Sequence, residues 1–143
     1  MLLDNGKVFA WGLGTDGQLG NGEKNFQFKP QQVKGDIEDI VISRIGGNTD
    51  TIVAFSKEGE LFAWGQNEYG QLGVYSDEPQ VFFPQHLHFN LGKVISASAT
   101  GSSCIVCNSE GHVFTWGSQV PAFIHYLFCS FCSLGFGFWP KNS

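Results

Sequence analysis

Gly59-Glu-Leu-Phe-Ala-Trp-Gly65, continued by Gln-Asn-Glu-Tyr-Gly-Gln-Leu-Gly73, decides the fold of this chain, because the sequence contains the pattern more than once. The same pattern runs earlier from Gly6 to Gly20, and a shortened copy runs later from Gly111 to Gly117. The tryptophans at the centres of the copies are 53 and 52 residues apart: Trp11, Trp64 and Trp116. A fixed period near fifty residues is typical of repeat architectures such as propellers.

Each copy begins with a predicted hairpin turn and continues as a strand. Asn5-Gly6 is a strong signal for a two-residue type I′ turn, in which both central residues have φ > 0. Glu58-Gly59 and Glu110-Gly111 occupy the same place in the other copies. Residues 8–11 then alternate between the two faces of a predicted strand.

Two further apolar runs precede each turn and predict two more strands. The nearer run covers residues 51–55 and 104–107, and the more distant run covers residues 40–45 and 93–99. Three short strands followed by a long glycine-rich loop are typical of a small antiparallel sheet that is repeated around an axis. No segment has a sustained helical period. We therefore predict an all-β fold of β-propeller repeats.

The motif Gly-x-[Val/Leu]-[Phe/Tyr]-x-Trp-Gly-x-x-x-x-Gly-Gln-Leu-Gly resembles the repeats of the regulator of chromosome condensation (RCC) family. The resemblance covers Leu2–Gly117 and implies a seven-bladed β-propeller, of which this chain would supply about two to three blades. The residues that carry the signature have a structural role: Gly6, Trp11, Gly12, Gly17, Gly20, Gly59, Trp64, Gly65, Gly70, Gly73, Gly111, Trp116 and Gly117.

The second repeat, through residues 83–116, looks most like a mitochondrial member of that family. The resemblance implies a guanine-nucleotide-exchange-like interaction module that contacts a GTPase or another protein through loops such as 65–73 and 77–84. It also implies mitochondrial ribosomal RNA assembly factors as partners and a mitochondrial location, with a cytoplasmic location as the alternative. The other function we consider is a truncated product without exchange activity, tethered or not by its C-terminal tail.

One departure from the family concerns the residues before the middle strand. Family repeats usually carry Gly-x-x-His-Thr there, whereas this chain has Gly47-Asn-Thr-Asp-Thr51 and Gly101-Ser-Ser-Cys104. We expect the missing histidines to remove a hydrogen-bond donor between strands.

The composition of the chain argues against direct binding of nucleic acid. The 143 residues carry a net charge of −5, and the eight Lys and Arg residues form no cluster. Sequence-independent binding of nucleic acid depends on such clusters to neutralise phosphates. We expect a protein partner and no cofactor.

The repeat pattern divides the chain into unequal parts. Residues 1–36 make part of a blade, 37–91 a complete repeat and 92–117 part of another blade. A closed propeller needs about four blades or more, so we expect a piece of a larger propeller. Residues 118–143 leave the pattern, and we expect an irregular apolar tail produced by an altered splice junction or gene model. A membrane anchor at residues 120–139 is the alternative, since its length suits a span.

Several constellations resemble chemical sites, and for each we favour a structural role. Gly12-Leu-Gly-Thr-Asp-Gly17 matches a dinucleotide-binding motif, but no helix is predicted after it to hold a phosphate. Cys104 and Cys107 are three residues apart, which places them on opposite faces of a strand and not around one zinc ion. The pair Cys129 and Cys132 falls in the tail.

The remaining polar groups also lack the partners that a site needs. His86 and His88 share a face without a third ligand, so we expect no metal. Asp36, Glu38 and Asp39 make an acidic cluster for which a solvated loop is the default. No serine, cysteine or histidine lies in a nucleophile motif, and we therefore expect no covalent catalysis.

Overall fold

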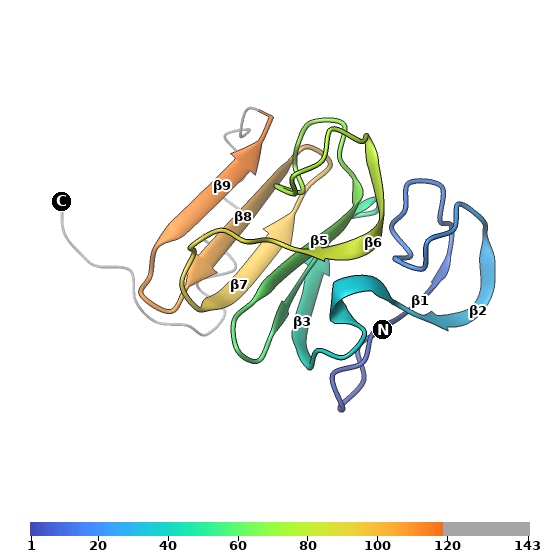
Figure 1. Cartoon of the computed structure of the whole chain (residues 1–143), viewed down its shortest axis with the longest axis horizontal. Helices are drawn as coiled ribbons and strands as arrows, with labels where there is room; N and C mark the ends of the chain where they lie inside the picture. Colours follow the sequence, from blue (N-terminus) through green and yellow to red (C-terminus); the bar gives the residue numbers. More distant parts are fainter. Residues whose placement is uncertain (119–143) are drawn as a thin grey trace.

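The computed structural model describes residues 1–118 and contains three antiparallel sheets, laid side by side in chain order (Figure 1). The first sheet pairs β1 with β2, the second has the order β3-β4-β5-β6, and the third has the order β7-β8-β9. The strands are β1 (Phe9–Gly12), β2 (Gln27–Gln32), β3 (Ile42–Gly47), β4 (Thr51–Ser56), β5 (Leu61–Gln66), β6 (Gln80–His86), β7 (Val94–Ala99), β8 (Ser103–Asn108) and β9 (Val113–Gly117). The described residues contain no α-helix, only the 3₁₀ turn η1 (Gly35–Ile37), so the predicted all-β class is confirmed.

The centre of the second sheet is buried between its two neighbours. Leu61, Phe62, Ala63 and Trp64 in β5 are each at most 2% exposed. Burial on both faces explains why this strand is apolar throughout and does not alternate with polar residues. The sheets approach closely at their inner strands, where a Cβ on Gly46 of β3 would lie 2.6 Å from the carbonyl oxygen of Ala97 in β7.

The hairpin turns differ from the predicted type I′ turns. The amide of Gly6 donates to Leu3 O at 2.9 Å, and the amide of Leu3 donates to Lys7 O at 2.9 Å. This pattern is a three-residue loop that ends in a single glycine of positive φ. The turns before β5 and β9 repeat it, with Gly59 and Gly111 at φ 89° and 85°. Only the glycine needs φ > 0, so the preceding position accepts glutamate.

The second sheet contains a fourth strand that the sequence did not predict. The sequence places residues 77–84 in a loop, whereas Gln80–His86 forms β6, which pairs with β5 at the outer edge of the sheet. Its counterpart β2 contains Pro30 and pairs with β1. Proline lacks the amide donor and is therefore confined to edge strands, as both strands are here.

The register of the strands corrects the alignment of the two segments that precede the middle strands. Ser103 pairs with Gly117 as Thr51 pairs with Gly65, so Thr51 and Ser103 are equivalent, and Gly101 is not the counterpart of Gly47. The Thr51 hydroxyl donates to Gln66 O at 3.4 Å. The Ser103 hydroxyl donates to the backbone oxygen of residue 118 at 2.9 Å. Both hydroxyls therefore donate between strands, but they stand at the position of the family's threonine; the missing histidines fall at Asp50 and Ser102, and the loss of their donor stays a prediction.

The tail that we expected to be irregular, beyond Ser118, lies outside the described residues, as does the proposed anchor. Within residues 1–118, no helix has the length and hydropathy needed to cross a lipid bilayer.

Candidate functional site

The groups that resemble chemical sites do not assemble into a reaction centre in the described part of the chain. Residues 13–26 contain no helix, so the glycine motif that begins at Gly12 lacks the helix N-terminus on which a dinucleotide phosphate would sit. In β8, Cys104 is 0% exposed, and burial raises the pKa of its thiol from 9.0 to about 12. The rings of His86 and His88 meet edge to face with centroids 4.4 Å apart. No group of three metal-ligating side chains occurs among residues 1–118.

The acidic cluster between the first two sheets has a structural role at one position. Asp36 in η1 accepts a hydrogen bond at 2.8 Å from the backbone amide of His86, at the end of β6. This carboxylate therefore joins η1 to the outer strand of the next sheet.

The first glycine loop, residues 12–20, holds the second sheet through one glutamine. Gln18 accepts a hydrogen bond at 2.8 Å from the amide of Asp16 and donates from its side-chain nitrogen to Asp50 at 3.2 Å. Its backbone oxygen accepts a bond of 3.0 Å from the Trp64 indole nitrogen. The loop is therefore fixed internally and bound to the next sheet at two points.

The second glycine loop repeats this arrangement against the third sheet. Gln71, 0% exposed, accepts from the amide of Tyr69 at 2.9 Å and donates to Gly101 O at 3.0 Å. Trp116 Nε1 lies beside Gly73, where a Cβ would come within 2.5 Å of it. Unlike its counterpart in Trp64, this nitrogen has no hydrogen-bond partner in the described residues.

The structure brings some predicted signature residues together and leaves others apart. Gly20 lies against Trp64 as Gly73 lies against Trp116, while Trp11 is 48% exposed. Five other signature glycines lie close to backbone or side-chain atoms of another segment: Gly6, Gly17, Gly59, Gly65 and Gly117. The other three have no non-local atom within 4 Å of a Cβ built on them: Gly12, Gly70 and Gly111.

The two glutamines were not among the predicted site residues, although they bind the loops to the sheets. Gln18 and Gln71 occupy the same place in the Gly-Gln-Leu-Gly segment, and this recurrence is the signal that could have identified them.

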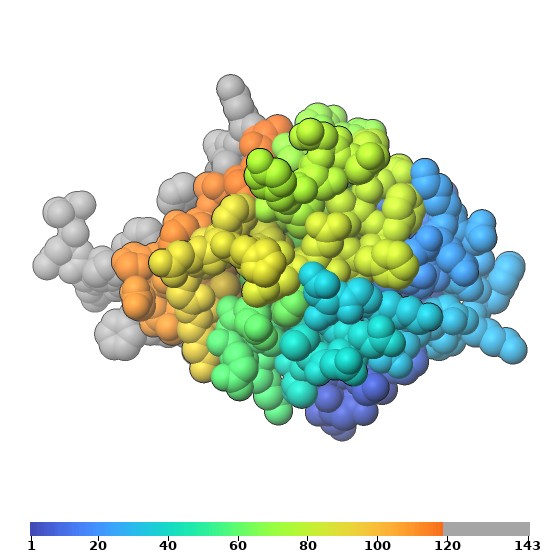
Figure 2. Space-filling view, in the orientation of Figure 1, coloured from blue at the N-terminus to red at the C-terminus, as the bar shows by residue number. Residues whose placement is uncertain are grey.

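The loop of residues 67–79, between β5 and β6, is the candidate interaction surface. Asn67, 5% exposed, donates to Ser76 O at 3.2 Å and to Glu78 O at 3.1 Å, and accepts from the amide of Leu72 at 3.2 Å. These bonds fix both ends of the loop. They leave Tyr69 54% exposed and Tyr75 fully exposed. The loop projects at the upper edge of Figure 2, in yellow-green. Its other exposed side chains are those of Pro79 and of three acidic residues, Glu68, Asp77 and Glu78.

Comparisons with known proteins agree with the repeat pattern. The model of the Regulator of chromosome condensation (RCC1) repeat matches residues 5–53 and 58–107. Each matched repeat begins at a turn of one sheet and ends in the next sheet, so sequence repeats and sheets are out of phase. The chain is 42% identical over 117 residues to the human RCC1-like G exchanging factor-like protein, and the match covers 81% of this chain and 25% of that protein. It spans about a quarter of the length of that relative.

Another relative is named for a different activity, ubiquitin ligation. The human Probable E3 ubiquitin-protein ligase HERC6 is 36% identical over 120 residues, which cover 82% of this chain and 12% of the ligase. The repeats are thus shared by proteins with different activities, and no covalent chemistry can be assigned to the repeats from these names.

Solved structures share the architecture. Human WBSCR16 is similar with a TM-score of 0.79 and 40% identity, covering 85% of this chain and 32% of that chain. Prp20p from Saccharomyces cerevisiae, described with its binding properties to Gsp1p and histones, has a TM-score of 0.70 at 22% identity, covering 81% of this chain and 30% of that one. The latter likeness shows the fold alone. Since the repeat model matches more than half of the sequence, this chain belongs to the regulator of chromosome condensation (RCC1) repeat family, and its sheets are blades of a β-propeller.

Proposed function

We propose that this chain is a protein-interaction module of a guanine-nucleotide exchange factor, and that it contacts a GTPase through the loop of residues 67–79. The observation that carries the proposal is the combination of a fixed backbone with two exposed tyrosines, Tyr69 and Tyr75. Tyrosine is enriched among the residues that contribute most to binding. A loop that is already ordered loses little conformational entropy when a partner binds.

Exchange of this kind requires no covalent step. A partner that binds the nucleotide-free GTPase more tightly than the nucleotide-bound form lowers nucleotide affinity by the same factor. The chain therefore needs only surface complementarity to its partner. The human relative named as an exchange-factor-like protein supports this class of function.

The proposal includes a mitochondrial location, which rests on the resemblance of residues 83–116 to a mitochondrial member of the family. A scaffold in mitochondrial ribosomal RNA assembly is the second form of the same proposal. The net charge of −5 favours contact with assembly proteins over contact with RNA itself.

Release of a fluorescent GDP analogue from small GTPases tests the exchange proposal. We expect the chain to accelerate release from at least one GTPase. The double substitution Tyr69→Ala and Tyr75→Ala should reduce the acceleration about tenfold or more, as for residues central to an interface. Phe28→Ala, on β2, is the matched control because Phe28 is an 87% exposed aromatic residue outside the loop. The exchange proposal is wrong if neither this chain nor a longer RCC1-like relative accelerates release.

A further inference from the structure

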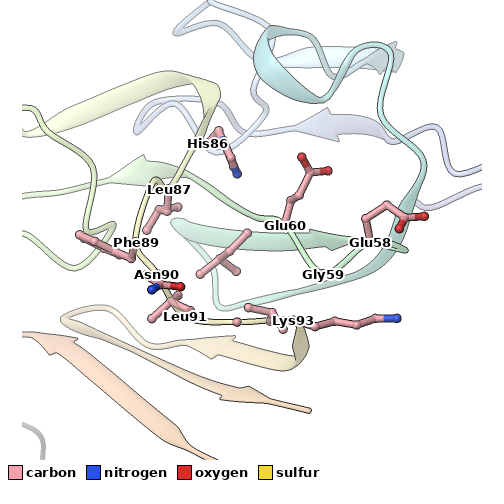
Figure 3. Close-up of a pocket in the computed structure, with 12 residues that line it drawn as sticks. Glu58, Gly59, Glu60, His86, Leu87, Phe89, Asn90, Leu91 and Lys93 are labelled. Atoms are coloured by element: carbon pink, nitrogen blue, oxygen red, sulfur yellow. The ribbon is translucent and has the colours of Figure 1, made fainter. Parts of the chain in front are cut away.

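A second surface feature lies at the other end of β5 from the loop of residues 67–79. It is a hollow of about 280 Å³ between the turn that begins β5, residues 58–61, and the connection from β6 to β7, residues 86–94 (Figure 3). The proposed exchange surface does not include these residues.

The hollow lies at a junction that is shorter than the preceding one. Leu87 N donates to Leu61 O as Val33 N donates to Val8 O, and Val94 N donates to Gly59 O as Ile42 N donates to Gly6 O. The two amide donors that bound the first junction, Val33 and Ile42, are thus nine residues apart. Those that bound the second, Leu87 and Val94, are seven residues apart. The first junction contains η1, and the second contains no helical turn.

The inner wall of the hollow is apolar. Leu61, Leu87 and Leu91 line it and are 2%, 4% and 8% exposed. Phe89 stands at the side, 51% exposed, with its ring set edge to face against Trp116 at 5.8 Å. A side chain that enters the hollow would therefore bury its carbon atoms against leucine and could lie along an aromatic ring.

The rim of the hollow carries more acidic than basic groups. Glu58 forms no hydrogen bond or ion pair with the described residues. Glu60 uses Oε2 to accept from the Ser56 hydroxyl at 3.0 Å. Figure 3 shows the Glu60 carboxylate on the same side of the hollow as the His86 ring, whereas the Glu58 carboxylate and the Lys93 ammonium group both extend outward from its centre. A cation is the complementary partner for this rim.

The size of the hollow sets the size of its occupant. At about 280 Å³ the hollow lies at the lower end of the range of about 300–1,000 Å³ that ligand pockets occupy, a size that accommodates one long side chain. Arginine combines an apolar stem with a planar guanidinium group that can bond to two carboxylates and stack on an aromatic ring. We propose that the hollow receives an arginine side chain from an extended basic segment of a protein partner.

Amide NMR of the ¹⁵N-labelled full chain tests the proposal. The probe is the peptide acetyl-Gly-Leu-Arg-Leu-Gly-amide, compared with the same peptide carrying neutral citrulline in place of arginine. We expect the arginine peptide to shift the amide signals of residues 58–61 and 86–94. The citrulline peptide should bind about tenfold more weakly, because a hydrogen bond between charged groups is lost.

Substitutions assign the effect to the rim. The double substitution Glu58→Gln and Glu60→Gln should weaken binding of the arginine peptide about tenfold, since glutamine keeps the shape of the glutamate side chain but not its charge. Glu68→Gln, in the loop at the other end of β5, should leave binding unchanged. Glu58→Gln alone keeps the test valid if the double variant loses its dispersed spectrum, because Glu58 has no partner in the described structure.

Four results would overturn the proposal, three of them from the experiments above and one from a further peptide. The first three are a citrulline peptide that binds as tightly as the arginine peptide, glutamine variants that bind the arginine peptide as tightly as the unaltered chain does, and the absence of localised amide shifts at millimolar peptide. If a peptide with glutamate at the same position shifts the same amides, the hollow is an anion site served by Lys93, and the proposal is also wrong.

Discussion

The indole nitrogen of Trp64 donates a hydrogen bond of 3.0 Å to the backbone oxygen of Gln18, and this bond joins the second sheet to the glycine loop of the first. The two residues are 46 positions apart. Trp64 is 1% exposed where the loop covers it, whereas Trp11, with no such loop over it, is 48% exposed. Packing between sheets thus depends on a directional bond as well as on apolar burial.

Trp64→Phe should destabilise the chain by about 1–3 kcal/mol or more, because the smaller phenyl ring leaves a void at this buried position and the Gln18 oxygen loses its donor inside the protein. Urea unfolding followed by circular dichroism measures the loss as a lower midpoint. Trp11→Phe is the matched control and should change stability by about 0.5 kcal/mol or less, as expected for a partly exposed side chain. Equal effects of the two substitutions would show that the hydrogen bond contributes nothing.

Gln71→Leu should cost about 2 kcal/mol or more. The substitution leaves the Tyr69 amide and the Gly101 oxygen without the partners that Gln71 gives them at 2.9 and 3.0 Å; both bonds are partly buried, so each lost partner should cost about 1 kcal/mol. Gln31→Leu on β2, where the side chain is exposed, is the control. Chemical denaturation compares the two variants. A loss no larger than that of the control would contradict the role assigned to Gln71 in fixing the second loop.

The sequence alone was enough to predict the repeat, the all-β class and the glycine positions, because all three follow from local patterns with a fixed period. It did not predict the outer strand β6, since Pro84 in an apolar run indicates a connection unless the run is known to lie at a sheet edge. The role of Gln71 was also missed, because its partner Gly101 is 30 residues away. Contacts between sheets depend on three-dimensional placement, which periodicity does not specify.

Gly59→Ala should destabilise the chain more than Gly111→Ala does. Both glycines close the same type of turn, at φ 89° and 85°, so a side chain strains the backbone equally at each. A Cβ at Gly59 would lie 2.8 Å from the Lys93 Cα, whereas a Cβ at Gly111 would meet nothing within 4 Å. Backbone strain alone costs about 1 kcal/mol or more, and Gly59→Ala adds a steric clash.

Thermal unfolding of the two alanine variants, compared with the unaltered chain, measures the difference directly. Gly111→Ala is the control, because it measures the cost of a side chain at positive φ alone. The additional fall in the unfolding midpoint of Gly59→Ala measures the contact between the turn and the start of β7. If the two midpoints fall by the same amount, the turn is not packed against Lys93 in solution.

Cys104 should resist alkylation in the folded chain, because burial raises the pKa of its thiol from 9.0 to about 12. At pH 8 this shift alone lowers the reactive thiolate fraction about a thousandfold, and burial also blocks the reagent. Iodoacetamide labelling followed by peptide mass spectrometry should show Cys104 modified only in denaturant. The thiol is neutral in both states below pH 9, so it should cost no stability there; stability should fall as pH rises from 9 towards 12, where only the unfolded state ionises. Rapid labelling of Cys104 without denaturant, at a rate near that of the unfolded chain, would mean that β8 is open to solvent.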